Sequence, residues 1–155
     1  MGGLNRLVER AARGEPATGN AEADEVLRQH PTAILMGILL DQQIRAEIAF
    51  SGPLKLKERL GHLDVKKIAS MDPEEFRSVF AQRPSVHRFA NMMADRVQSL
   101  AAALVDQFGG DAGQIWAEDA DLKTIEQRTR KLPGFGPNKL KMMKEVLELF
   151  GYRHF

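Results

Sequence analysis

The chain has 155 residues, of which 43% are apolar and 28% charged, and its net charge is +1; this is the composition of an ordinary soluble globular protein. That length suits one compact domain with a sizeable core. Cysteine is absent, which excludes disulfides, thiolate zinc sites and iron–sulfur clusters.

Glycine and proline divide the sequence into helical segments, with no strand-like alternation of useful length and no internal repeat. The breaks fall at Gly14–Pro16, Pro31, Gly52–Pro53, Pro73, Pro84, Gly109–Gly110 and Leu132–Pro137. We therefore predict an all-α fold in a single domain over residues 1–155. Residues 1–20 are expected as a flexible N-terminal segment, and residues 125–150 as a helix, a hairpin and a second helix.

Apolar spacing predicts which helix faces are buried. After Pro31, a buried face is expected from residues at helical spacing: Ile34, Leu35, Ile38 and Leu39. Asp72, followed by a proline and two glutamates, predicts a helix start. Later stripes predict two more buried faces: Met93, Val97, Leu100, Leu104 and Phe108, then Leu140, Met143, Leu147 and Phe150.

Signals for a membrane or for secretion are missing from the sequence. No apolar run approaches the ~20 residues that span a bilayer. Residues 1–19 lack the apolar stretch of a secretory signal. We expect a cytoplasmic protein with no membrane partner.

The most informative segment is Leu132-Pro133-Gly134-Phe135-Gly136-Pro137-Asn138-Lys139, between two basic helical stretches. Two glycines allow a tight turn and the close approach of a ligand. Pro137 suits the first position of a helix. Free backbone amides at a helix N-terminus attract anions, so this hairpin suits a phosphate.

Charge is concentrated around the hairpin. Residues 123–144 contain seven basic residues and one acidic residue, a local charge of +6 that leaves −5 for the rest of the chain. Such clustering is typical of a nucleic-acid contact. The alternative is that the hairpin is only a helix stop and the charge run a solvated face.

Three segments resemble the helix-hairpin-helix DNA glycosylases (the HhH-GPD superfamily), the group that includes endonuclease III and the adenine glycosylases. They are the hairpin Leu132-Pro133-Gly134-Phe135-Gly136, the segment Ile38-Leu39-Leu40-Asp41-Gln42-Gln43, and the long amphipathic stretch His87 to Phe108. Short matches at Ala49-Phe50-Ser51-Gly52-Pro53 and His87-Arg88-Phe89 are similar to a small bacterial branch that lacks the iron–sulfur cluster.

The resemblance implies a monomer that binds double-stranded DNA in the nucleoid and excises a damaged base. It implies no cofactor, apart from a monovalent cation at the hairpin carbonyls. The residues expected to contact DNA are Gln42, Gln43, His87, Arg88, Lys131, Gly134, Phe135, Gly136, Asn138, Lys139 and Lys141.

We expect the usual catalytic pair of the family to be absent. Asn138 occupies the position of the lysine that attacks the sugar in bifunctional members, and an amide cannot form a Schiff base. Lys139 is next to it, but one helical step of about 100° is expected to point it elsewhere. The family's aspartate would lie about eighteen residues further on, whereas the carboxylate side chains after Asn138 are Glu145 and Glu148, both in the predicted last helix. The sequence therefore predicts base removal without a lyase step.

Asp41 is the best replacement for the missing carboxylate, because it follows an apolar helix where the family lines its base pocket. A carboxylate there can stabilise positive charge on the sugar or orient a water. The alternative is an i, i+4 surface pair with Arg45. Glu47 is a weaker candidate.

Three polar side chains accompany this carboxylate. Gln42 and Gln43 can fill the gap left by a flipped base or read its orphaned partner; ordinary helix-end polarity is the alternative. His87 can contact phosphate or assist acid–base chemistry, or it can be structural.

Two functions are consistent with these features. The first is a monofunctional glycosylase, and the second is a catalytically silent DNA-binding module that recognises a distorted duplex.

Overall fold

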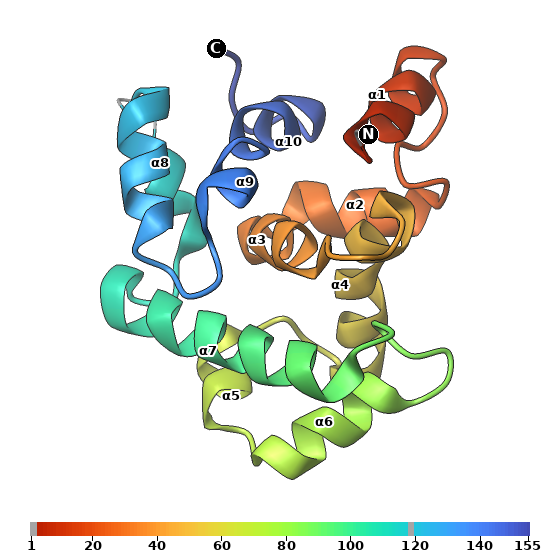
Figure 1. Cartoon of the computed structure of the whole chain (residues 1–155), viewed down its shortest axis with the longest axis vertical. Coiled ribbons are helices and arrows are strands. Elements are labelled where there is room, and N and C mark those ends of the chain that lie inside the picture. Colours follow the sequence, from red (N-terminus) through yellow and green to blue (C-terminus); the bar gives the residue numbers. More distant parts are fainter. Residues whose placement is uncertain (1–2, 118–119) are drawn as a thin grey trace.

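The computed structural model describes residues 3–117 and 120–155. Its regular elements are all helical, as expected (Figure 1). They are α1 (Leu4–Ala12), α2 (Ala21–Gln29), α3 (Pro31–Leu40), α4 (Ala46–Leu60), α5 (Val65–Ser70), α6 (Pro73–Ala81), α7 (Ala90–Phe108), the 3₁₀ helix η1 (Ala112–Trp116), α8 (Leu122–Arg130), α9 (Pro137–Leu140) and α10 (Met143–Leu149).

Local sequence signals explain many of the helix ends. The side chains of Asn20, Asp64, Asp72 and Asp121 each accept hydrogen bonds from first-turn amides of the helix that follows. The predicted start at Asp72–Pro73 is confirmed. Gly109 ends α7 in the left-handed conformation, with φ of 60°, where a side chain would be strained.

Helix α3 is the centre of the core. The sequence predicts one buried face, but every residue from Thr32 to Leu40 is buried. Other helices surround α3: it packs against α2, α4, α7 and η1. A Cβ atom on Gly37 would lie 2.3 Å from Phe50 Cδ1, so this glycine is what allows α4 to cross so closely.

The expected break at Gly52–Pro53 is wrong, because both residues lie inside α4. Proline removes one backbone donor and costs helix stability in isolation. Tertiary packing overrides this, since Gly52 and Pro53 are buried and a Cβ on Gly52 would meet Leu40 Cδ1 at 2.6 Å. Helix α4 therefore runs unbroken from the turn after α3 toward α5 and α6 (Figure 1).

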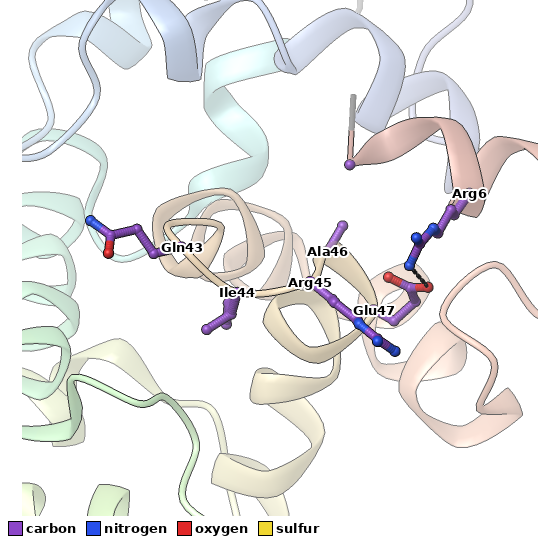
Figure 2. A pocket seen from close by; sticks show the side chains of 7 residues that line it. Arg6, Gln43, Ile44, Arg45, Ala46 and Glu47 are labelled. Carbon is purple, nitrogen blue, oxygen red and sulfur yellow. Dashed lines mark ion pairs between the residues drawn. The ribbon is translucent and has the colours of Figure 1, made fainter. Parts of the chain in front are cut away.

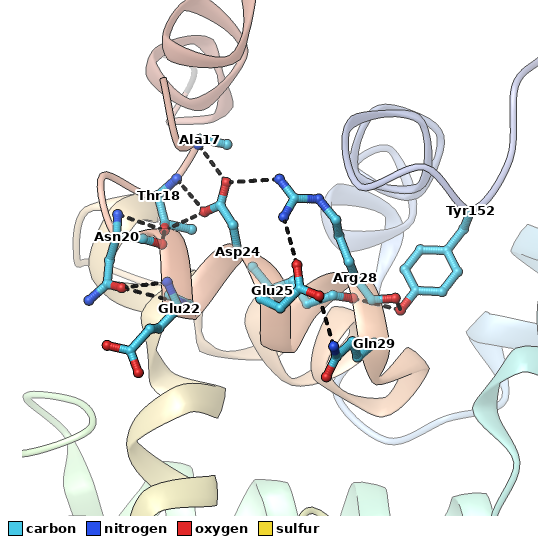
Figure 3. Close-up of polar contacts among 11 residues, drawn as sticks. Ala17, Thr18, Asn20, Glu22, Asp24, Glu25, Arg28, Gln29 and Tyr152 are labelled. Atoms are coloured by element: carbon cyan, nitrogen blue, oxygen red, sulfur yellow. Dashed lines mark hydrogen bonds and ion pairs between the residues drawn. The ribbon is translucent and has the colours of Figure 1, made fainter. Parts of the chain in front are cut away.

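The N-terminal segment is packed rather than flexible over its described residues, 3–20. Leu7 in α1 is fully buried. Asp24 of α2, 2% exposed, accepts hydrogen bonds from the amides of Ala17 and Thr18 and from the Thr18 hydroxyl, at 2.6–3.0 Å (Figure 3). This buried carboxylate is satisfied by structural donors, so it anchors the segment.

The C-terminal segment of the chain packs against α2. The Tyr152 hydroxyl lies 2.6 Å from the Leu27 carbonyl and 2.8 Å from the Arg28 carbonyl (Figure 3), and burial raises its pKa to about 12. The predicted buried face of the last helix is confirmed at Leu140, Met143, Leu147 and Phe150. No helix in the described ranges is long and apolar enough to cross a membrane.

Candidate DNA-binding and base-excision site

The hairpin joins α8 to α9 and rests on the end of α3. Gly134 has φ of 88°, and a Cβ there would lie 2.7 Å from Leu39 Cδ1, so both the backbone and the packing require glycine. The Phe135 side chain is 3% exposed and belongs to the core. The prediction that Phe135 contacts DNA is therefore wrong for its side chain, which anchors the hairpin instead.

Gly136 differs from Gly134. Its φ of −81° is open to any residue, and nothing lies within 4 Å of a Cβ built on it. The backbone amides of Gly134, Phe135, Gly136 and Asn138 donate to no acceptor in the part of the chain that the structure describes. Gly134, Gly136 and Asn138 are exposed residues, so their free amides are available to a phosphate.

The second helix of the motif is divided. Helix α9 ends at Leu140, and α10 begins at Met143 after a turn. Glu145 and Glu148 both lie in α10, as expected. Five basic side chains of the segment are exposed around the hairpin: Lys123, Arg130, Lys131, Lys141 and Lys144. Arg128 is instead used structurally, since its guanidinium donates to the carbonyls of Gln114 and Ile115, both at 3.1 Å.

Asp41 caps the C-terminus of α3 and lines a pocket of about 540 Å³ next to the hairpin. The other lining residues are Gln42, Gly136, Pro137, Asn138, Lys139 and Met142. Among the described residues Asp41 forms no ion pair, so the alternative of a helix-surface pair with Arg45 is wrong. Helix α3 ends at Leu40 and Arg45 precedes the first residue of α4, so the i, i+4 geometry does not arise.

The environment of Asp41 makes its charged form less favourable than it is in water. Burial raises the pKa of its carboxyl, and the nearby Lys139 ammonium opposes that rise. A partly desolvated carboxyl with a shifted pKa that lines a pocket is typical of catalytic sites.

Lys139 points into this pocket, contrary to the expectation that it points elsewhere. Its Nζ donates a hydrogen bond to the backbone carbonyl of Asp41 at 2.9 Å. Lys139 follows Asn138 on α9, a single short turn, and the helical step directs Lys139 rather than Asn138 toward Asp41. This placement leaves Asn138 exposed and directs the next residue inward. Burial lowers the pKa of the Lys139 amine; the Asp41 charge opposes this and the Arg96 charge adds to it.

The two glutamines have different roles in the turn that follows Asp41. The side chain of Gln42 is held in place: it donates to the Leu39 carbonyl at 3.2 Å and accepts from the Arg96 guanidinium at 3.1 Å. Gln43 is exposed and adopts φ of 58°, a conformation that is uncommon for residues other than glycine. Such outliers cluster at functional sites, which makes Gln43 the better candidate for reaching into a duplex.

His87 is 1% exposed, so its predicted contact with phosphate is wrong for this structure. Its Nδ1 accepts from the Phe89 amide at 2.9 Å, which assigns the ring proton to Nε2. Nε2 then donates to the Gln42 carbonyl at 3.1 Å. His87 is therefore a positioning residue for the glutamine turn. Arg88, beside it, is exposed; its guanidinium donates to the Gln43 carbonyl at 3.5 Å and lies over the Phe89 ring.

A second pocket, of about 640 Å³, continues from the glutamine turn along the start of α4 (Figure 2). It is lined by Gly3, Arg6, Gln43, Ile44, Arg45, Ala46 and Glu47. Glu47 pairs with Arg10 at 2.9 Å and with Arg6 at 3.8 Å. Burial would raise the pKa of Glu47, but its backbone hydrogen bond and these arginines lower it overall. A paired, ionised Glu47 is a poor alternative to Asp41.

Arg96 is not predicted from the sequence as a site residue, although its guanidinium donates to the Gln42 side chain. It lies 54 residues from its partner, in the middle of an amphipathic helix, where an arginine is unremarkable. No local pattern could have identified it.

The buried His87 predicts a pH-dependent stability. Burial lowers its pKa below the ordinary value, and the Gln42 and Leu40 carbonyls oppose this. The unfolded chain then binds the extra proton first, so stability is full above about pH 6.5 and falls as the pH drops through the folded pKa. Urea unfolding between about pH 7.5 and 5.5 should show a shallower loss in His87→Gln than in wild type, by up to about 1.4 kcal/mol per pH unit.

The control is His30→Gln, because the His30 pKa is also lowered, by burial and by Lys57. It should remove a smaller part of the slope, since His30 is half-exposed. Parallel slopes for His87→Gln and wild type would contradict the assignment.

The fold and the site together define an all-helical protein with a hairpin that carries free backbone amides and a pocket lined by Asp41 beside it. The chain belongs to the HhH-GPD superfamily of base excision DNA repair proteins: the family model described as "HhH-GPD superfamily base excision DNA repair protein" matches residues 36–151. The match includes Asp41, the glutamine turn and the hairpin. No curated protein and no solved structure matches the chain. Membership confirms the resemblance and places the protein among DNA-binding proteins of base excision repair.

Proposed function

We propose that the protein is a monofunctional DNA glycosylase, which removes a damaged base by hydrolysing its N-glycosidic bond. The observation that carries this proposal is the half-buried Asp41 carboxylate in a pocket beside the hairpin. As the base departs, positive charge develops on the sugar, and a carboxylate in a desolvated site stabilises that charge more than it stabilises the substrate. A water held by the same carboxylate then adds to C1′.

The hairpin would bind the phosphate backbone of DNA. Its free amides and the exposed lysines suit phosphate oxygens, which fix register without reading sequence. Gln43 would occupy the gap left when the damaged nucleotide turns into the pocket, since a side-chain amide can both donate and accept. Arg88 would approach the backbone on the other side of the turn. One protein molecule, acting as a monomer, suffices for this arrangement.

A monovalent cation would fit the hairpin. The carbonyls of Leu132, Pro133, Gly134 and Phe135 accept no hydrogen bond from any described residue. A cation held by these carbonyls would supply a positive charge for a phosphate oxygen. No other cofactor is proposed.

Binding to undamaged duplex should depend steeply on salt, because the contacts are electrostatic. With roughly four to five phosphate contacts, the affinity should fall roughly 150- to 500-fold between about 50 and 200 mM salt. Fluorescence anisotropy with a labelled duplex measures this. An affinity that does not change with salt would contradict binding through contacts with the DNA phosphates.

A screen of lesions tests the catalytic proposal. Duplexes carrying uracil, hypoxanthine, an alkylated purine or an oxidised base are incubated with protein and then treated with alkali, which cuts at every abasic site. Cleavage of at least one duplex is expected. If the protein binds all of them and cuts none, the silent module that recognises distorted DNA becomes the better proposal.

A further inference from the structure

The turn between α3 and α4 is held at its backbone carbonyls by side chains from distant parts of the chain. Three consecutive carbonyls accept such hydrogen bonds: Asp41 from Lys139 at 2.9 Å, Gln42 from His87 at 3.1 Å, and Gln43 from Arg88 at 3.5 Å. Within this turn Gln43 has φ of 58°, and an uncommon conformation of this kind persists only where its surroundings hold it. The path of the turn therefore depends on these contacts.

Lys139 connects the turn to the hairpin. It follows Asn138, whose free amide is one of the donors available to a phosphate, so adjacent residues of α9 face the phosphate and the Asp41 carbonyl. The exposed lysines of this region are Lys123, Lys131, Lys141 and Lys144, whereas Lys139 is half-buried in the wall of the pocket. A lysine that only met a phosphate would lie in solvent, where its charge costs least to maintain. The burial of Lys139 therefore indicates a role toward Asp41.

We propose that Lys139 is a positioning residue for Asp41: its side chain holds the Asp41 turn against the hairpin, so that the phosphate contact fixes where the carboxyl meets the sugar. The inference deepens the proposed function and rests on it for the reaction. A displacement of about 1 Å between reacting groups can cost on the order of 100-fold in rate. Loss of this one hydrogen bond should therefore affect the chemical step more than the binding of DNA.

The charge of Lys139 acts on the same carboxyl. Burial raises the pKa of Asp41, and the Lys139 ammonium opposes that rise. Without the ammonium, the pKa of Asp41 should be higher. Because the reaction needs the ionised carboxylate, excision should then be lost at a higher pH than in wild type as the solution is acidified.

The other charged or titratable side chains around the turn have partners of their own. Arg6 of α1 pairs with Glu47, Arg88 of the loop before α7 lies over the Phe89 ring, and Arg96 of α7 donates to the Gln42 side chain. Burial lowers the pKa of His87, which leaves its ring neutral at pH 7. The effect on the Asp41 carboxyl is therefore assigned to Lys139.

Lys139→Met tests the inference, because methionine removes the donor and the charge and keeps a long unbranched side chain. On a lesion found active, the single-turnover rate at saturating protein should fall roughly ten- to 100-fold. The acid limb of the pH–rate profile should move to higher pH, which a purely structural role would not cause. Lys139→Arg keeps the charge and a donor, so its rate and its pH profile should stay close to those of wild type.

Two other lysines make the result specific. Lys67→Met is the matched control, because Lys67 is exposed on α5, outside the pocket and the hairpin, and this variant should excise like wild type. Lys141→Met should weaken duplex affinity, since an exposed lysine beside the hairpin is lost, but should not move the acid limb. Lys139→Gln, which is also neutral, replaces Lys139→Met if circular dichroism shows the latter to be unfolded.

The titration of Asp41 can also be measured without any lesion. Carbon-13 NMR follows the carboxyl groups, and the Asp41 signal is assigned by its loss in Asp41→Asn. The pKa of Asp41 should be higher in Lys139→Met than in wild type and nearly unchanged in Lys139→Arg.

Three results would overturn the inference: an Asp41 pKa in Lys139→Met equal to that of wild type, a wild-type excision rate in Lys139→Met, or a loss of rate that Lys139→Arg shares. Each of these leaves the glycosylase proposal standing if wild type excises a lesion. If wild type excises none, the glycosylase proposal fails, and the NMR titration alone decides whether Lys139 acts on Asp41: a raised pKa supports the inference and an unchanged pKa overturns it.

Discussion

Asp41→Asn is expected to abolish base excision, with a loss of about 100-fold or more in the single-turnover rate. Asparagine has nearly the same shape and leaves the backbone carbonyl that accepts from Lys139, but it carries no charge to stabilise the sugar cation. Duplex affinity should change little, because the hairpin amides and exposed lysines make the phosphate contacts. The measurement is a single-turnover assay on a lesion found active, at saturating protein.

The free energy of unfolding is the first control for Asp41→Asn. Because burial disfavours the charged carboxylate, its replacement should leave the free energy of unfolding unchanged or raise it, as is common at functional sites. Asp106→Asn, an exposed carboxylate on α7 outside the pocket, is the matched control and should excise normally. Normal excision by Asp41→Asn would show that the carboxylate takes no part in the chemistry.

Gly136→Asp is expected to abolish duplex binding while the protein remains folded. The substitution places a side chain and a negative charge where the phosphate should approach. Nothing lies within 4 Å of a Cβ at this position and its φ of −81° suits any residue, so the fold should tolerate the change. Anisotropy measures the binding, and circular dichroism checks the helix content.

Alanine substitutions at Gly136 and Gly134 distinguish an effect on DNA binding from an effect on folding. Gly136→Ala adds a small neutral group and should weaken binding far less than the aspartate does. Gly134→Ala should instead destabilise the protein, because it forces a side chain to φ of 88° and against Leu39 Cδ1. A folded Gly136→Asp variant that binds DNA like wild type would remove the hairpin from the interface.

The sequence by itself was sufficient for the fold class, several helix ends and the family. These features depend on signals within a few residues of each other: the Asp72–Pro73 cap, the glycine of the hairpin turn, and apolar residues at helical spacing. It also predicted that Asp41 follows an apolar helix, and the structure places this residue at the end of α3 in the pocket beside the hairpin. It misjudged Gly52–Pro53, since local propensity does not include the packing of α3 on α4.

Only the tertiary structure decided how the side chains of the site are used. It turned Lys139 toward Asp41, which lies 98 residues away in the chain, and buried His87 against Gln42, 45 residues away. It held Gln42 with Arg96 and left Gln43 exposed. The physical reason is that a side chain's direction, burial and pKa depend on the groups that folding brings beside it, and no periodicity or cap encodes partners so distant in sequence.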